Sequence, residues 1–297
     1  MTSCPAPVKP FLYLSWAVML LSIVPTVTKY VFQQSDIDPV GIACARVGIG
    51  FLFLLVAALV RDRRGLAALS LRDVCLLTIL GWLGVGSYVI AAWGIQHTRV
   101  THYILIYSLL SPLTSLFSMM LGKSRFTSLK VMGLVLSVIG CLCAVSRNGF
   151  DLSVEFGFGD GLILLFTLMM ATHIVLSVGI VKRFGALVAH TVMFGSSAVM
   201  LVVEDLLSAA PLHVQASLPI GCAMTFIGIA TASVFLLRSL ALQTLTPATV
   251  AVCHNLVPVT AILFAHLYLG ESIGVGTFVG GAAILAGVEM VRRSEAP

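Results

Sequence analysis

Long apolar runs separated by short polar segments make up nearly the whole chain. The hydrocarbon core of a bilayer is crossed by about 20 apolar residues in an α-helix. By that measure we predict ten spans, at residues 11–33, 39–60, 73–95, 99–121, 126–146, 158–181, 187–207, 219–242, 246–268 and 273–291. Helices are expected because backbone amides in lipid must be hydrogen-bonded within the segment. The pattern therefore predicts an all-α polytopic membrane protein.

Composition agrees with a lipid environment. Of the 297 residues, 59% are hydrophobic and 10% are charged, whereas average proteins contain about 25% charged residues. The formal net charge is +5, but the basic residues form short clusters between apolar runs. We interpret them as topology signals and expect no nucleic acid partner. The first run begins at Phe11 and no small-residue cleavage site ends it, so we interpret it as the first span.

The sequence lacks the motifs of several enzyme classes. It contains no GxxxxGK(S/T) phosphate loop, no HExxH pair and no GxSxG elbow. Its seven cysteines form no CxxC pair and no cluster with metal-ligand spacing. We therefore expect no ATP hydrolysis, no metal, no cofactor and no catalytic residue. The cysteines are interpreted as small apolar core residues.

The distribution of basic residues predicts the orientation of the spans. If both termini are cytoplasmic, inner loops and tails hold twelve of the 17 basic residues and outer loops hold two, Arg99 and Arg147. The twelve are Lys9, Arg61, Arg63, Arg64, Arg72, Lys123, Arg125, Lys130, Lys182, Arg183, Arg292 and Arg293. Cytoplasmic loops of membrane proteins carry an excess of Lys and Arg. An even number of spans with both termini cytoplasmic is therefore predicted.

The second half of the chain repeats the first at an offset of about 147 residues. Matching pairs are Gln96 and Gln243, Pro112 and Pro258, Thr114 and Thr260, and the segments 121–124 and 269–272. Five helices separate the copies, and because five is odd the second copy enters the membrane in the opposite orientation. We predict two five-helix units, residues 1–150 and 151–297, forming a 5+5 inverted-topology repeat. Such repeats are typical of secondary transporters, whose sites lie near the midplane.

The motifs of the second copy resemble the EamA family of the drug/metabolite transporter superfamily. They are Gln243, Thr246-Pro247-Ala248, Pro258-Val259-Thr260-Ala261, Leu269-Gly270-Glu271 and the glycines from Gly280 to Gly287. In the first half the resemblance lies at Trp16, Lys29, Pro39 and Arg46, and Gly159-Asp160 resembles the usual opening of the second half. Ala17 and Lys123 depart from the pattern, where a glycine and an acid are usual.

The resemblance covers essentially the whole chain and implies a ten-helix carrier of small metabolites, often an exporter, in the inner membrane of the cell. It implies that helices 1–4 and 6–9 surround a central cavity, with helices 5 and 10 at the side. These motifs are specific for the superfamily and say little about the substrate.

Two polar pairs near the membrane midplane are candidate substrate ligands. Tyr107 and Ser108 lie about eight residues into the fourth span, and His254 and Asn255 lie at a similar depth in the ninth. The repeat superposes the two pairs. Hydroxyl, imidazole and amide groups would suit a polar substrate. Alternatively, His254 and Asn255 hydrogen-bond neighbouring helices and hold the bundle together.

Each pair lies within one turn of a proline, Pro112 or Pro258. A proline removes a backbone donor and leaves a carbonyl free, so we expect helix kinks at both positions. Ser111 belongs to a stripe of hydroxyl side chains in the fourth span, at positions 101, 108, 111, 115 and 118. Such a stripe lines a polar cavity or allows close helix packing, and the sequence does not separate the two.

Arg46 is the candidate for binding a substrate carboxylate. It lies about seven residues into the second span, and a charge at the bilayer centre costs roughly 2.5–3.5 kcal/mol on insertion scales, so such charges are usually functional. Its side chain could instead extend toward the outer surface. Lys29 and Arg238 lie nearer the ends of their spans, and we expect both to reach the surface in that way.

Aromatic and histidine side chains complete the candidate site. Tyr88 lies deep enough to form a cavity wall, whereas Trp93 and Tyr103 lie near the outer boundary and are interpreted as interfacial anchors. His173, inside the sixth span, is a candidate substrate ligand that could relay protons because its reference pKa is near neutrality. The alternative for His173 is a neutral histidine of the helix core.

The sequence thus predicts a secondary transporter that exports small polar metabolites, such as amino acids, through a central cavity by alternating access. Proton coupling through His173 or His254 is one energy source, and the gradient of the substrate is the other. The alternatives are a receptor or assembly scaffold without transport activity and an intramembrane enzyme, for which no buried acid pair is found. Glycines such as Gly276 and Gly280 would serve a homodimer or packing within one chain.

Overall fold

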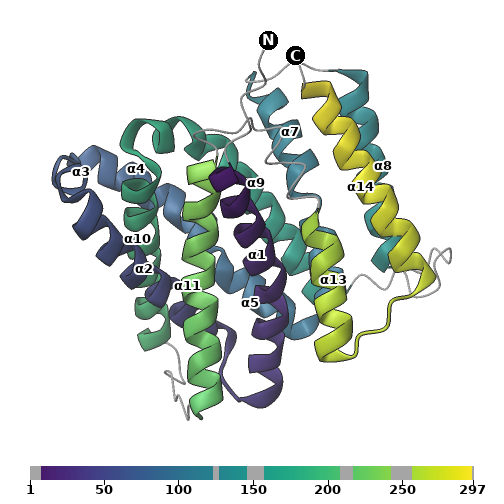
Figure 1. Ribbon diagram of the computed structural model, residues 1–297, viewed down its shortest axis with the longest axis horizontal. Coiled ribbons are helices and arrows are strands. Elements are labelled where there is room, and N and C mark those ends of the chain that lie inside the picture. Colours follow the sequence, from purple (N-terminus) through teal and green to yellow (C-terminus); the bar gives the residue numbers. More distant parts are fainter. Residues whose placement is uncertain (1–7, 123–126, 146–156, 208–216, 242–255, 296–297) are drawn as a thin grey trace.

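The computed structural model describes residues 8–122, 127–145, 157–207, 217–241 and 256–295. These residues form helices and short links, and no strand occurs among them. In chain order the elements are α1 (Val8–Gln34), α2 (Pro39–Arg61), α3 (Arg63–Ala67), α4 (Leu71–Gly81), the π-helix η1 (Trp82–Gly86), α5 (Tyr88–His97), α6 (Val100–Tyr107), α7 (Leu110–Met120), α8 (Ser128–Val145), α9 (Phe158–Phe184), α10 (Ala186–Leu207), α11 (Leu218–Ala241), α13 (Leu256–Leu269) and α14 (Val275–Glu295). Figure 1 shows them as one bundle.

The all-helical membrane architecture is confirmed. Among the described residues, seven helical segments are long and apolar enough to cross a membrane, at Pro10–Gln34, Pro39–Arg61, Leu71–His97, Val100–Met120, Phe158–Phe184, Ala186–Leu207 and Leu218–Arg238. They coincide with predicted spans one to four and six to eight. Shorter apolar helices, Ser128–Cys143, Leu256–Leu269 and Val275–Val291, overlap the remaining predicted spans. The chain therefore has seven helices of spanning length in its described part, and three shorter apolar ones.

The helix ends are fixed by polar residues and glycines. The side chain of Asp38 accepts a hydrogen bond from the Gly41 amide at the start of α2, where Pro39 occupies the first helical position. Ser70 and Asp73 form a capping box at the start of α4. Gly185, with φ of 82°, is the single residue that links α9 to α10. These signals stop each apolar helix at its end and place the polar residues outside the lipid core.

Two of the spanning segments are interrupted near their middle. The third widens into the π-helix η1, and such single turns are often found at functional sites. The fourth is broken between α6 and α7 at Ser108 and Leu109. Pro112 lies four residues beyond Ser108, and a proline both lacks the amide that would bond that carbonyl and crowds it. The missing amide and the ring of Pro112 therefore explain why the helix breaks at this position.

Helices α8 and α14 lie side by side at one edge of the molecule (Figure 1) and are in close contact. A Cβ atom on Gly133 would lie 2.5 Å from the carbonyl oxygen of Gly287, and one on Gly140 would lie 2.7 Å from that of Gly280. Small residues allow such backbone approach between membrane helices. These four glycines thus serve packing within the chain, and a role in a homodimer stays a prediction.

The two halves make matching contacts across the bundle. A Cβ atom on Gly81 would lie 2.7 Å from the Met193 carbonyl oxygen, and one on Gly228 would lie 3.2 Å from that of Arg46. Gly228 is the counterpart of Gly81 in the second half, and Met193 is the counterpart of Arg46, each at the same offset of about 147 residues. Helix α1 packs on α11 as α5 packs on α9, which are the corresponding pairs with the halves exchanged. The same contacts are therefore made twice, once by each half.

We predict that Gly140→Val destabilises the protein because its side chain would meet the backbone of α14. Overpacking a close contact typically costs about 1–3 kcal/mol, so the midpoint of thermal unfolding in detergent should fall by several degrees. Gly179→Val in α9 is the matched control, since a Cβ atom there has no neighbour within 4 Å. Equal midpoints for the two variants would contradict this packing of α8 on α14.

Candidate functional site

Arg46 of α2 is buried between the two halves of the chain, with 5% of its surface exposed. Its Nε donates a hydrogen bond to the Thr231 hydroxyl of α11, at 2.9 Å. Its guanidinium lies over the ring of Tyr88 in α5, 3.8 Å from the ring centroid. A hydrogen bond and a cation–π contact therefore hold the charge inside the bundle.

Three further aromatic side chains continue from Tyr88. The Tyr88 ring centroid lies 5.4 Å from that of Phe166 in α9, which lies 5.6 Å from that of Tyr107 at an interplanar angle of 15°. Tyr103 stacks on Tyr107 at 5.8 Å and 10°. We call Arg46, Tyr88, Tyr103, Tyr107, Phe166 and Thr231 the central cluster. Its members come from five helices of both halves, so helix packing alone brings them together.

A second cation accompanies the central cluster. Arg238 lies near the end of α11 and is partly exposed, and it interacts electrostatically with Tyr88 and Tyr107. From its position in the sequence we expected this side chain to reach the membrane surface. Arg238 is partly exposed and lies close enough to the tyrosines for its charge to act on them, so two arginines lie near the cluster.

The structure brings Arg46, Tyr88 and Tyr107 of the predicted site together. Ser108 is next to the cluster at the α6–α7 break, where its hydroxyl donates to the Ile104 carbonyl oxygen. Ser111 is exposed on α7. Pro112 is buried in α7, and Pro258 lies in the first turn of α13. His254 and Asn255 lie outside the described residues, so their role as ligands stays a prediction.

His173 of α9 lies against the third span and contacts the backbone there. It is 2% exposed, and its Nδ1 is 2.8 Å from the Leu80 carbonyl oxygen of α4. Its ring occupies the space that a Cβ atom on Gly84 of η1 would need. A hydrogen bond to a carbonyl next to the π-helix explains this histidine structurally. Its predicted roles in substrate binding and proton transfer stay untested.

Sequence reasoning missed several members of the central cluster. Tyr103, interpreted as an interfacial anchor, is only 4% exposed, whereas Trp93 is 41% exposed. The spacing of four between Tyr103 and Tyr107 places both on one helix face and could have identified the pair. Nothing in the sequence marks Phe166 and Thr231 as site residues, because phenylalanine and threonine are common in apolar helices. Their membership depends on how α9 and α11 pack against the first half.

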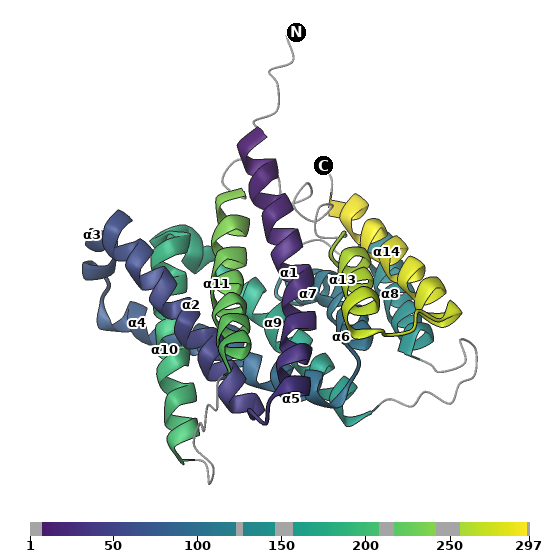
Figure 2. The same ribbon diagram turned by 60° about the horizontal axis from the view of Figure 1, so that its bottom comes forward.

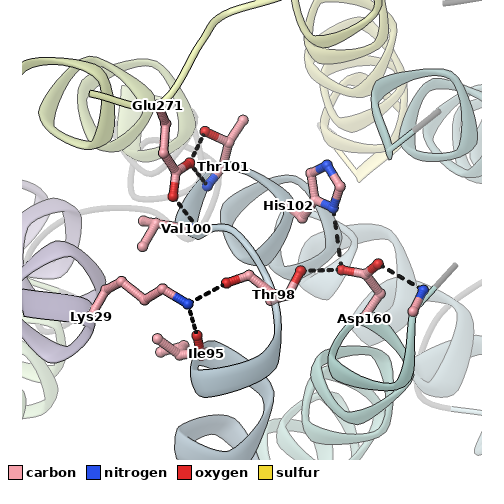
Figure 3. Close-up of polar contacts among 9 residues, drawn as sticks. Lys29, Ile95, Thr98, Val100, Thr101, His102, Asp160 and Glu271 are labelled. Carbon is pink, nitrogen blue, oxygen red and sulfur yellow. Dashed lines mark hydrogen bonds and ion pairs between the residues drawn. The ribbon is translucent and has the colours of Figure 1, made fainter. Parts of the chain in front are cut away.

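A second polar group surrounds the turn between α5 and α6 (Figure 3). Lys29 of α1 extends its Nζ to the carbonyl oxygens of Ile95 and Thr98, at 2.8 Å each, and to that of Gln96 at 3.1 Å. These carbonyls belong to the end of α5, where a helix has no amide donors left. The ammonium group of Lys29 therefore caps α5 from a different helix.

Two carboxylates hold the other side of the same turn. Glu271, in the link between α13 and α14, accepts hydrogen bonds from the amides of Val100 and Thr101, at 2.8 and 2.9 Å, and from the Thr101 hydroxyl. This arrangement places a negative charge at the N-terminus of α6, where the helix dipole favours it. Asp160 of α9 accepts from the hydroxyl of Thr98 and lies 3.4 Å from His102 Nδ1.

We call Lys29, Thr98, Thr101, His102, Asp160 and Glu271 the turn network, and Figure 3 shows all six around the turn. It joins the ends of α1, α5, α6 and α9 and the α13–α14 link, and so ties both halves together at one end of the bundle. No group of three or more His, Cys, Asp or Glu side chains that could hold a metal ion occurs in the part of the chain that is described.

Known proteins place this architecture in a family. The model of the EamA-like transporter family matches residues 9–146 and again residues 157–293. The chain belongs to the EamA-like transporter family. It is a membrane protein that resembles the transporters of this family, as the sequence motifs indicated. The predicted unit boundary at residue 150 falls between the two matches, outside the described residues, and stays a prediction.

A solved structure supports the fold. It is described only as "Crystal structure of protein", and it is 16% identical to this chain, with a TM-score of 0.70 over 98% of this chain and 100% of the other. At this identity the likeness shows the fold alone. No curated protein matches the sequence, so the substrate has to be inferred from the site.

We predict that Thr231→Val destabilises the protein because the buried Arg46 charge loses its hydrogen-bond acceptor. Hydrogen bonds to charged groups contribute about 1.5–3 kcal/mol, so the midpoint of thermal unfolding in detergent should fall. Thr225→Val is the matched control, since Thr225 lies on the same helix, bonds the carbonyl four residues earlier as Thr231 does, and is exposed. A fall of equal size in both variants would refute this role of Thr231.

Proposed function

We propose that this EamA-like protein is a secondary transporter that moves small polar metabolites, such as amino acids, out of the cell through the centre of the bundle. The observation that carries the proposal is the central cluster, a charged and aromatic group buried where the two halves meet. Intramembrane charges that face the inside of a bundle mark substrate pathways in membrane proteins. A site between two related halves is the arrangement found in secondary transporters.

We further propose ten spans arranged as two inverted five-helix units, with both termini in the cytoplasm. The reciprocal contacts of Gly81 and Gly228 support two related units. The start of α1 and the end of α14 lie toward the same side of the bundle in both views (Figure 2), as an even number of spans requires. The distribution of basic residues in the sequence favours an orientation in the inner membrane with that side facing the cytoplasm.

In this orientation the turn network lies at the outer face and closes the bundle there. Each of Lys29, Asp160 and Glu271 holds the α5–α6 turn from a different element. Alternating access requires one end of a carrier to open while the other is shut. We propose that release of these contacts opens the outer end, and that their return closes it after the substrate has left.

The test is transport by the purified protein reconstituted into vesicles, with a broad panel of amino acids and other metabolites. Arg46→Ala should lower the transport rate at least about tenfold, since a loss of about 1.4 kcal/mol in binding has that effect. Arg183→Ala is the control, because Arg183 is exposed at the end of α9 and far along it from Phe166. If the wild-type protein moves no solute of the panel, the carrier proposal fails and a receptor or scaffold is favoured.

We predict that Glu271→Ala opens the outer end by freeing the first turn of α6. Loss of a helix cap costs about 1 kcal/mol, which raises the fraction of open molecules severalfold. The measurement is labelling of Val100→Cys, introduced into a cysteine-free protein, by a membrane-impermeant maleimide from outside. Val100 is fully buried, so the cysteine should react slowly unless Glu271 is replaced.

The control for this labelling is Glu289→Ala, which removes a carboxylate on α14 that pairs with Arg293 far from the turn. Labelling should then stay as slow as in the parent protein. Equal rates with and without the Glu271 carboxylate would mean that the turn network does not hold the outer end shut.

A further inference from the structure

We propose that the central cluster binds a small organic anion, a carboxylate with a flat aromatic body and a net negative charge, in preference to a zwitterion. This inference rests on the proposed transport function and narrows its substrate class. It is carried by the balance of charges around the cluster, by the shape of its aromatic part, and by a comparison between the two halves.

The charges around the cluster are positive and have no acidic partner. The contacts of Arg46 are to the Thr231 hydroxyl and the Tyr88 ring, both of which are uncharged at neutral pH. Arg238 adds a second positive charge near the tyrosines. Among the described residues, neither arginine forms a salt bridge with a carboxylate.

The sequence explains why no acid is available. Its twelve acidic residues lie in links or toward helix ends, at positions 36, 38, 62, 73, 151, 155, 160, 204, 205, 271, 289 and 295. Asp160 and Glu271 belong to the turn network, and Glu289 pairs with Arg293. Residues 242–255, the chain between α11 and α13, contain no Asp or Glu. A bound anionic solute is therefore the group that would bring a negative charge to the cluster.

An anion satisfies this site better than a zwitterion does. An unpaired buried charge is costly, and a carboxylate can take two parallel hydrogen bonds from a guanidinium. The Nε of Arg46 is occupied by Thr231 and the guanidinium also hydrogen-bonds Tyr88, so a carboxylate would compete with Tyr88 for the terminal amino groups. The ammonium group of an amino acid would meet two cations and no carboxylate. Net charge therefore separates the two substrate classes.

The aromatic part of the cluster favours a flat body. Phe166 and Tyr103 both lie nearly parallel to Tyr107, at interplanar angles of 15° and 10°. A flat ligand ring that displaced one of these buried side chains would stack on the ring faces of the others, and offset stacking of aromatic pairs is worth about 0.5–1.5 kcal/mol beyond burial. An aryl carboxylate would place its ring on these faces and its charge near Arg46.

The second half shows that the fold does not require the arginine. Met193 takes the place of Arg46 in the matching contact, and Phe235 follows Tyr88 at the same offset of about 147 residues. There the neighbouring rings, Phe194 and Phe235, pack edge to face at 5.5 Å, and Met193 is fully buried. No arginine occupies the corresponding position, and the buried ring of His190 packs against Phe235 at 5.1 Å. The arginine–tyrosine pair is a feature of one half, as expected of a ligand site.

The experiment measures binding and transport of four phenols that share one ring and differ in charge. They are para-hydroxyphenylacetate, which is an anion, tyrosine, which is a zwitterion, tyramine, which is a cation, and the uncharged para-hydroxyphenylethanol. Affinity is measured by calorimetry on the purified full-length protein in gluconate buffer, and uptake is measured in vesicles. The anion should bind at least about tenfold more tightly than tyrosine, which corresponds to about 1.4 kcal/mol.

The variant Arg46→Met installs the residue that the second half already uses. It should lose the preference for the anion, whereas Arg46→Lys should retain part of it because the charge remains. Arg183→Met, at the exposed end of α9, should keep the full preference. The thermal midpoint of each variant shows whether it is folded, and if Arg46→Met is unfolded the Arg46→Lys protein decides.

The inference is overturned if tyrosine binds as tightly as the anion, or if none of the four phenols binds while another metabolite is transported. It is also overturned if replacing gluconate by chloride removes the preference, since an inorganic anion would then be the occupant. Those results would not contradict the proposed transport function. If no solute crosses the vesicle membrane in any of these experiments, it is the proposed function itself that fails.

Discussion

The guanidinium of Arg46 is the group on which the central architecture depends. A charge inside a membrane bundle is stable only if polar or aromatic groups face it, because lipid offers no solvation. Thr231 supplies a hydroxyl and Tyr88 supplies the face of its ring. Since these residues belong to α11 and α5, satisfying one charge fixes the position of two further helices. Cation–π contacts away from water are worth about 2 kcal/mol, comparable to the cost of inserting the charge.

The polar groups of the molecule are divided between two places with different physical roles. The turn network uses Lys29, Asp160 and Glu271 to satisfy the backbone groups and hydroxyls where α5 ends and α6 begins. Every charge there has a partner within the chain. The central cluster instead holds Arg46, whose partners are uncharged. A fully paired group stabilises the turn that it surrounds, and an incompletely paired one is suited to a ligand.

Close backbone contacts give the bundle its rigidity around this centre. Glycines at Gly81, Gly133, Gly140 and Gly228 let helices of opposite halves approach until a Cβ atom would clash. Such contacts fix the rotation of each helix about its own axis, and that rotation decides which side chains point inward. The repeated contacts also explain how similar halves carry different chemistry, since Arg46 and Met193 occupy corresponding places.

The sequence predicted how deep a side chain lies in the membrane better than it predicted which side chains it contacts. Arg46, Tyr88 and Tyr107 were chosen because they lie far from the ends of their spans, and they lie together in the bundle. Tyr103 was assigned to the membrane surface on the same criterion, yet it is buried on Phe166. His173 was selected for its titration, and its contact with the Leu80 carbonyl lies next to a π-helix that no sequence pattern predicted.

By itself the sequence determined the helical class, the membrane environment, the family and the repeat. These follow from hydropathy, loop charges and motifs, which are properties of successive residues and need no knowledge of what lies opposite them. Only the tertiary structure decided that Thr231 and Phe166 belong with Arg46, and that Glu271 caps α6. Those pairings depend on the rotation and crossing of helices far apart in the chain, which are set by the packing of the whole bundle.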